Sequence, residues 1–239
     1  MNAQGDSEIY ALSIETIDGK RSFGIPVNLS NNPGYDNQPS FFDESTLLFS
    51  SSRNEQTDIA LYSFNDNGKT WLSSTKQGSE YSPLLIPNDR AVSAIRLDTT
   101  GLQRLYRYPL SGAIPQPLFQ KAKIAYHVWI DAHQLVATVL VENRMDLVLA
   151  NTKNERIKTV YTNVGRSLHR IPNSSKVSFV QTMQGKSTVY AIDPMNSKLE
   201  LLISFTHPIT DMYWFSDRLF LYSVGDLINE VDVLTSNQK

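Results

Sequence analysis

A repeated pattern of short β-type runs and turns is the feature that most constrains how this chain can fold. Aligned on the last apolar residue of the first run in each copy, the repeats follow one another at intervals of 44, 44, 41 and 44 residues. The aligned positions are Phe42, Ile86, Ile130, Ile171 and Phe215. A period of about 40–45 residues with four strands per copy is typical of propeller blades. We therefore expect an all-β fold, a β-propeller of four-stranded blades.

The clearest copy begins at Tyr35 and holds four β-type runs separated by turn residues. Asp, Asn, Ser and Gly supply the turns, and β-branched, aromatic and other apolar residues fill the runs. The four runs cover residues 35–42, 46–51, 58–64 and 70–73. An ordinary β-sandwich with evenly spaced hairpins is the alternative fold, but a sandwich has no reason to repeat the same pattern at a fixed period.

The two ends of the chain bear on the number of blades. The last copy holds three β-type runs, and residues 8–14 and 24–29 form extra runs that resemble the later strands of a blade. An N-terminal strand that completed the C-terminal blade would remove an exposed sheet edge. We therefore expect five blades, with six as the alternative, closed by an N-terminal strand. A single β-propeller domain is expected over residues 1–239.

Charge and cysteine content exclude several classes of function. The chain has 22 basic and 24 acidic residues and no basic run, so it lacks the electrostatic footprint of a nucleic-acid binder. Without cysteine it has no disulfide, thiolate metal site or cysteine nucleophile. No apolar stretch reaches the roughly 20 residues of a membrane-spanning helix, and no signal peptide is visible. We expect no nucleic-acid partner, no membrane insertion, no metal and no cofactor, and we expect a monomer.

Residues 35–64 resemble the TolB-like, WD-repeat-like propeller repeat. That repeat combines a proline and an aromatic residue, an acidic turn, an apolar strand ending in Ser-x-Arg, and a following Asp-Ile pair. The matching residues are Pro39, Phe41, Asp43, Phe49, Ser50, Ser51, Arg53, Asp58 and Ile59. The usual Ser-Pro-Asp-Gly turn is nowhere intact. The resemblance implies a stand-alone propeller without the N-terminal domain of TolB, acting as a non-catalytic, periplasmic or otherwise exported binding module of the bacterial envelope.

Each residue that carries the resemblance also has a structural interpretation. Asp43 and Arg53 are expected to organise turns, because acidic side chains cap nearby backbone groups. Asp58 is expected to pair with Arg53 across a hairpin. Phe41, Phe42 and Phe49 are expected to lie in the core.

Residues 66–71, Asp-Asn-Gly-Lys-Thr-Trp, match the core of the sialidase Asp-box, a hairpin turn between the third and fourth strands of a blade. Asp66 is expected to supply turn hydrogen bonds, Gly68 a positive φ, and Trp71 a ring beneath the loop. The motif favours a propeller without indicating activity, because the arginine cluster and tyrosine–carboxylate pair of sialidases cannot be assigned. A glycan-binding or glycan-hydrolysing propeller is therefore the alternative function.

Other catalytic motifs are missing: the sequence has no Gly-x-Ser-x-Gly, no His-Glu-x-x-His and no phosphate-binding glycine loop. We therefore assign no catalytic residue and expect no enzymatic activity. Polar residues near the starts of first strands would converge at one mouth of a propeller channel and could bind a protein partner or a small polar ligand. The residues predicted to do so are Asp36, Glu80, His127, Arg166, His169 and Asp211. A solvated channel without a specific ligand is the alternative.

Aromatic residues near these positions allow two interpretations. They could belong to the core, or they could form an exposed patch of the kind that binds proteins. The residues in question are Tyr81, Tyr126, Trp129, Tyr213 and Trp214. The sequence therefore favours a binding or scaffold module.

Overall fold

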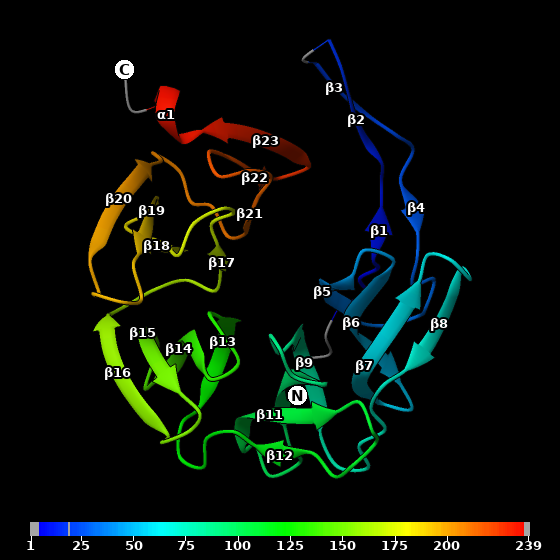
Figure 1. Cartoon of the computed structure of the whole chain (residues 1–239). Helices are drawn as coiled ribbons and strands as arrows, with labels where there is room; N and C mark the ends of the chain where they lie inside the picture. Colours follow the sequence, from blue (N-terminus) through cyan, green and yellow to red (C-terminus); the bar gives the residue numbers. More distant parts are fainter. Residues whose placement is uncertain (1–4, 19, 237–239) are drawn as a thin grey trace. The chain divides into compact units, whose positions relative to one another are not determined.

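The computed structural model describes residues 5–18 and 20–236, and nearly all regular structure in these ranges is β (Figure 1). One short helix, α1 (Val233–Ser236), follows the last strand. Within the described ranges, no helix is both long and apolar enough to cross a membrane. The chain divides into two compact units, Met1–Leu118 and Phe119–Lys239. One domain over residues 1–239 stays a prediction, and residues 1–4, 19 and 237–239 of it lie outside the described residues.

The first unit contains two blades, each a four-stranded antiparallel sheet whose strands pair in chain order. Tight turns rich in Asp, Asn and Gly join the strands, so each strand returns beside the one before it. The first blade consists of β5 (Asp36–Asp43), β6 (Thr46–Arg53), β7 (Gln56–Ser63) and β8 (Gly68–Trp71). The second consists of β9 (Ser79–Leu85), β10 (Ala91–Leu97), β11 (Gln103–Pro109) and β12 (Gln116–Pro117).

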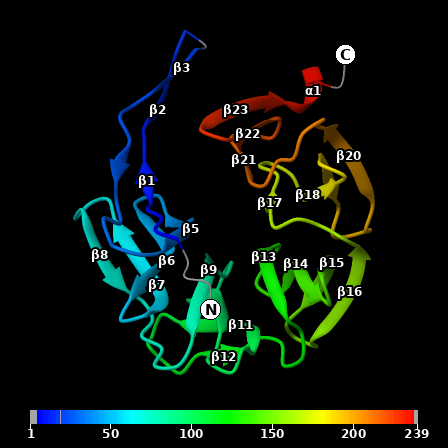
Figure 2. The same cartoon turned by 180° about the vertical axis from the view of Figure 1, so that it is seen from behind.

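The second unit continues the same pattern, and Figure 2 shows the strands of each blade side by side in chain order. The third blade consists of β13 (Ile124–Trp129), β14 (Gln134–Val141), β15 (Arg144–Asn151) and β16 (Arg156–Tyr161). The fourth consists of β17 (Leu168–Arg170), β18 (Val177–Met183), β19 (Lys186–Ile192) and β20 (Leu199–Ser204). The fifth consists of β21 (Met212–Trp214), β22 (Leu219–Val224) and β23 (Leu227–Asp232). The five predicted blades are confirmed.

The N-terminal strands pair among themselves. β1 (Tyr10–Ala11) pairs with β4 (Val27–Asn28), and β2 (Ile14–Ile17) pairs with β3 (Lys20–Phe23). In the described residues the fifth blade has three strands, β21 to β23. Closure of this blade by an N-terminal strand, which belongs to the other unit, stays a prediction.

The core lies between blades, because the middle strands bury both of their faces. In β6, Leu48 packs toward the second blade with Val92 of β10, whereas its neighbour Phe49 packs on the opposite face with Ile9 and Leu29. Successive side chains of a strand point to opposite faces, so such strands have continuous apolar runs rather than alternating ones. The same packing joins the third to the fourth blade and the fourth to the fifth.

Local details of the first blade confirm some expectations and correct others. The Asp43 carboxylate accepts a hydrogen bond from Ser45 N at 2.8 Å, and Arg53 Nε lies 2.7 Å from Asp58 Oδ2, as predicted. The prediction that Phe41 lies in the core is wrong, since its side chain is 62% exposed. Irregular register on both sides of it in β5 shifts the alternation. Phe42 packs toward the core, as predicted.

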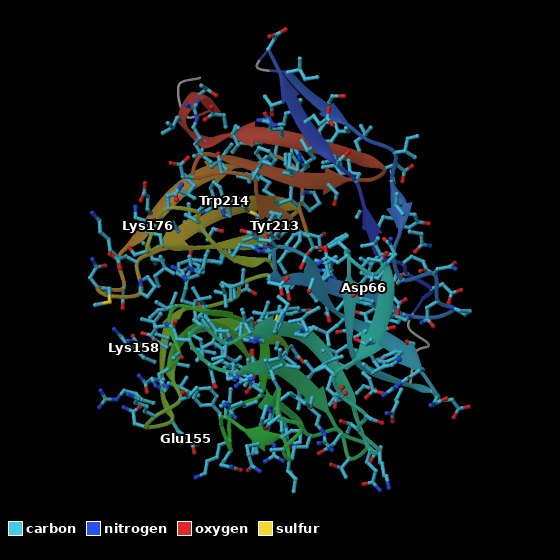
Figure 3. All side chains as sticks on the ribbon, turned by 45° about the vertical axis from the view of Figure 1, so that its right-hand side comes forward. Asp66, Glu155, Lys158, Lys176, Tyr213 and Trp214 are labelled. Atoms are coloured by element: carbon cyan, nitrogen blue, oxygen red, sulfur yellow. The ribbon has the colours of Figure 1, made fainter. Side chains whose placement is uncertain are left out.

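The Asp-box forms the expected turn between β7 and β8, where Figure 3 labels Asp66. Asp66 Oδ2 accepts a hydrogen bond from Ser63 Oγ at 2.8 Å, and Trp71 packs against the core cluster beneath. The positive φ belongs to Asn67, at 48°, and not to Gly68 as expected. Asn tolerates this left-handed conformation because its short polar side chain bonds locally.

Candidate functional site

The six residues predicted to bind a ligand or partner fall into two groups. Asp36 and Glu80 belong to the first unit, and His127, Arg166, His169 and Asp211 belong to the second. A common channel mouth for all six stays a prediction, and each group is described by itself.

Glu80, in β9, is a fully buried carboxyl group. Its Oε1 accepts a hydrogen bond from Tyr108 Oη at 2.9 Å, and its Oε2 accepts one from Ser73 Oγ at 3.1 Å. Desolvation raises the pKa of Glu80 to about 7, and the nearby Asp58 carboxylate acts in the same direction. Glu80 is therefore partly protonated at neutral pH.

Asp58, beside Glu80, closes the loop that follows β8. Its Oδ1 accepts a hydrogen bond from Thr75 N at 3.1 Å, in addition to the ion pair with Arg53. Asp146 in β15 repeats this arrangement, with Arg144 Nε at 2.8 Å and a backbone amide, that of Asn163, at 3.1 Å. In both blades the capped amide lies 17 residues further along the chain. The recurrence identifies the buried aspartate as a structural part of the blade.

Asp36, at the start of β5, is also buried, with 1% of its surface exposed. Its Oδ1 accepts a hydrogen bond from Asn32 Nδ2 at 3.2 Å. Oδ2 has no hydrogen-bond partner among the described residues. Asp36 and Glu80 are thus both enclosed. Their predicted contact with a ligand stays a prediction.

In the second unit, Arg166 and Asp211 form an ion pair with two parallel contacts. Arg166 Nε donates to Asp211 Oδ1 at 2.9 Å, and Arg166 Nη2 contacts Asp211 Oδ2. These residues precede β17 and β21 and are one repeat apart in the chain. Both side chains are about half exposed, so the pair lies at the surface.

The His169 ring in β17 lies edge-on to Tyr213 in β21, with ring centroids 5.3 Å apart. Desolvation lowers the pKa of His169 to about 4, while Asp211 acts in the opposite direction, so the imidazole is neutral at pH 7. The structure thus brings together three predicted residues and one aromatic residue of the second unit. We call these four residues, Arg166, His169, Asp211 and Tyr213, the Tyr213 patch.

Strand alternation separates the core from the surface within β21 (Figure 3). Tyr213 is 63% exposed, whereas Trp214 is buried and donates from Nε1 to Ser178 Oγ at 2.7 Å. Of the aromatic residues with two possible interpretations, Tyr213 belongs to the surface, and Trp214 and Trp129 belong to the core.

His127, in β13, is a core residue rather than part of the Tyr213 patch. It is buried, and its ring lies edge-on to Trp129 with centroids 6.2 Å apart. Burial alone lowers the pKa of His127 to about 3. Its predicted role in ligand contact stays a prediction.

Sequence reasoning missed Tyr108 and Ser73, which hold Glu80, and did not pair His169 with Tyr213. The missed signal is the period itself. Residues one repeat apart on first strands become neighbours when blades pack, so His169 predicts a contact at Tyr213, just as Arg166 predicts one at Asp211.

The Tyr213 patch offers binding groups more than catalytic ones. Arg166 and Asp211 neutralise each other, and His169 is uncharged and packed against a ring. Among residues 5–18 and 20–236, no cluster of three or more His, Asp or Glu side chains is placed to hold a metal ion.

Solved structures of other proteins have a similar fold. No protein-family model and no curated protein matches the sequence. TolB from Acinetobacter baumannii superposes with a TM-score of 0.63 at 13% identity, over 83% of this chain and 52% of TolB. A chain of a nidogen/laminin complex superposes with a TM-score of 0.75 at 13% identity, over 98% of this chain and 89% of that one. The chain has a TolB-like β-propeller fold. It spans about half the length of the Acinetobacter TolB.

An enzyme also shares this fold. An oligogalacturonate lyase in complex with manganese superposes with a TM-score of 0.54 at 14% identity, over 98% of this chain and 84% of the lyase. At these sequence identities the similarities establish only the fold, so any activity has to be inferred from the residues of this chain.

Proposed function

We propose that the protein is a non-catalytic binding module that docks a protein partner through the Tyr213 patch. One observation carries this proposal: the exposed Tyr213, packed edge-on against His169, lies two residues along the chain from Asp211, which holds the guanidinium of the exposed Arg166 in place. Tyrosine and arginine are enriched among the residues that dominate binding energy at protein interfaces.

The geometry of the patch reduces the cost of binding. Asp211 fixes the Arg166 guanidinium through two contacts, and His169 supports one edge of the Tyr213 ring. Side chains that are already ordered lose less conformational entropy when a partner covers them. The exposed part of the Tyr213 ring would supply apolar contact area, and its hydroxyl would supply a hydrogen bond.

Two further considerations support a binding role. The chain of similar fold in the nidogen/laminin complex comes from an assembly of two proteins. The resemblance to the TolB-like repeat implies an exported envelope protein, and we extend this to a periplasmic location and a monomeric state. A glycan-active propeller is the competing function. Because the oligogalacturonate lyase has a similar fold, the test below also covers glycan binding and cleavage.

The test begins with capture of partners by the purified protein from envelope extract. An identified and purified partner is then titrated against the wild-type protein and the variants Tyr213→Ala and Arg166→Ala. Met195→Ala is the matched control, because Met195 is 80% exposed in the loop between β19 and β20. Truncation of a dominant interface residue costs about 2 kcal/mol or more, so each patch variant should weaken binding roughly 30-fold.

Two results would reject the proposal. One is a partner that binds the patch variants as tightly as it binds the wild-type protein and the Met195→Ala control. The other is the absence of any retained protein, together with binding or cleavage in a glycan screen. The second result would favour the glycan-active function.

A further inference from the structure

A pocket of about 520 Å³ opens in the first unit, separate from the Tyr213 patch. Its walls are the loop after β8, residues 72–77, and the end of β11 with the loop that follows, up to Pro115. Arg96 of β10 forms part of the wall. The volume falls within the usual range for small-molecule sites, about 300–1,000 Å³.

One part of the pocket is positively charged. Arg96 Nη2 donates to Gln77 O at 2.9 Å, and the guanidinium carbon lies 5.2 Å from the centre of the Tyr106 ring. Arg96 Nε is buried and has no hydrogen-bond partner in the part of the chain that the structure describes. Lys76, which is exposed, adds a second cation to the lining.

The acidic groups near the pocket are largely compensated. Asp58 pairs with Arg53, and Glu80, enclosed beneath Tyr108 and Ser73, has a pKa near neutrality. The Asp98 carboxylate, which interacts with Arg96 through space, is occupied by Thr100 and by Leu102 N. The pocket therefore favours an anion over a cation.

The rest of the lining is apolar or carries hydroxyl groups. Leu72, Pro109, Ala113 and Pro115 supply apolar surface, and Ser74 and Thr75 supply hydroxyl groups. Gly78 makes room for the charged side chain, because a Cβ there would lie 3.2 Å from Arg96 Nε. Gly78 also has a φ of +134°, which other residues rarely adopt.

We propose that this pocket binds small organic carboxylates with a short apolar body. The carboxylate faces Arg96 and Lys76, where charge-assisted hydrogen bonds form, and the apolar body lies against Pro109, Ala113 and Pro115. The site is independent of the Tyr213 patch and of the protein partner proposed for it.

Hexanoate is the probe, and hexanamide, of the same length but uncharged, is its control. Binding is followed by backbone amide shifts in the NMR spectrum of the whole protein, with attention to residues 72–77 and 110–114. We expect hexanoate to shift these amides, and hexanamide to bind at least tenfold more weakly. A charge-assisted hydrogen bond contributes about 1.5–3 kcal/mol, so Arg96→Gln should weaken hexanoate about tenfold or more.

Three further variants separate binding in the pocket from effects on folding. Ala113→Trp fills the pocket and should abolish the shifts, whereas Ile114→Trp, at the next and 79% exposed position, should leave them intact. Lys76→Ala should weaken hexanoate severalfold without touching the core, and so tests the charge even if Arg96→Gln misfolds. Absence of hexanoate-induced shifts, equal binding of hexanamide, or full binding by Ala113→Trp would overturn the proposal.

Discussion

Replacing Glu80 by Gln should change how stability depends on pH. Glu80 is enclosed, and its folded-state pKa of about 7 lies above the ordinary value of 4.5. The folded state therefore keeps a proton between about pH 4.5 and pH 7 that the unfolded state has released. The stabilisation linked to this proton is fully present below pH 4.5 and is lost as the pH rises through about 7.

The size of the effect follows from the pKa difference. One pKa unit corresponds to about 1.4 kcal/mol, so this carboxyl lowers the free energy of unfolding by about 2–3 kcal/mol between pH 5 and pH 8. Gln has the shape of the uncharged acid and does not titrate. Relative to the wild type, Glu80→Gln should therefore be more stable at pH 8 than at pH 5, by the same amount.

Urea unfolding of both proteins at several pH values from 5 to 8 measures this difference, and other titrating groups cancel between the two curves. If the difference in free energy of unfolding between wild type and variant stays constant within about 0.5 kcal/mol across this range, the raised pKa of Glu80 and the enclosure that causes it are refuted.

Three other predictions concern the structure of the blades. Asp58→Ala should lower the free energy of unfolding by about 3–5 kcal/mol, because it removes the carboxylate that pairs with Arg53 and accepts from Thr75 N. Asp146→Ala should cost less in the same urea-unfolding measurement, because Arg144 is more exposed than Arg53. His127 should stay neutral down to about pH 4, since burial lowers its pKa, and ring signals that titrate near pH 6.5 in NMR spectra would contradict this. Gly78→Ala should destabilise by about 1–3 kcal/mol in thermal unfolding, because Leu97 O would lie 3.0 Å from the new Cβ; an unchanged midpoint would be inconsistent with the strained backbone.

Much of the fold could be predicted because the information is local and periodic. The spacing of five apolar residues marks the ends of the first strands. Ile86, Ile130, Ile171 and Phe215 directly follow β9, β13, β17 and β21, and Phe42 is the second-last residue of β5. The turn at Asp43 and the Arg53–Asp58 pair also follow from residues close in sequence, which a single blade brings together.

The errors arise where local geometry departs from the ideal repeat. Irregular register in β5 places Phe41 at the surface, and no composition signal marks such a bulge. The turn of the Asp-box places its positive φ at Asn67, one residue before the glycine.

The candidate sites depend on packing between blades, which the sequence shows only through its period. The contact between Glu80 and Tyr108 joins residues 28 positions apart, on the first and third strands of one blade, and gives no local signal. The contacts of Arg166 with Asp211 and of His169 with Tyr213 cross from the fourth to the fifth blade. Burial of Asp36, Glu80 and His127 depends on neighbours in space, so polar residues at equivalent repeat positions can end in the core or at the surface.

Site-specific photo-crosslinking tests the central claim, that the Tyr213 patch is the docking surface, most directly. A benzophenone side chain placed at position 213 is compared with the same group at position 195, which is more exposed but lies outside the patch. Irradiation in the presence of envelope extract should give one dominant protein adduct at position 213 and none of that mass at position 195. Equal adducts at both positions, or an adduct at position 195 alone, would contradict the docking role of the Tyr213 patch.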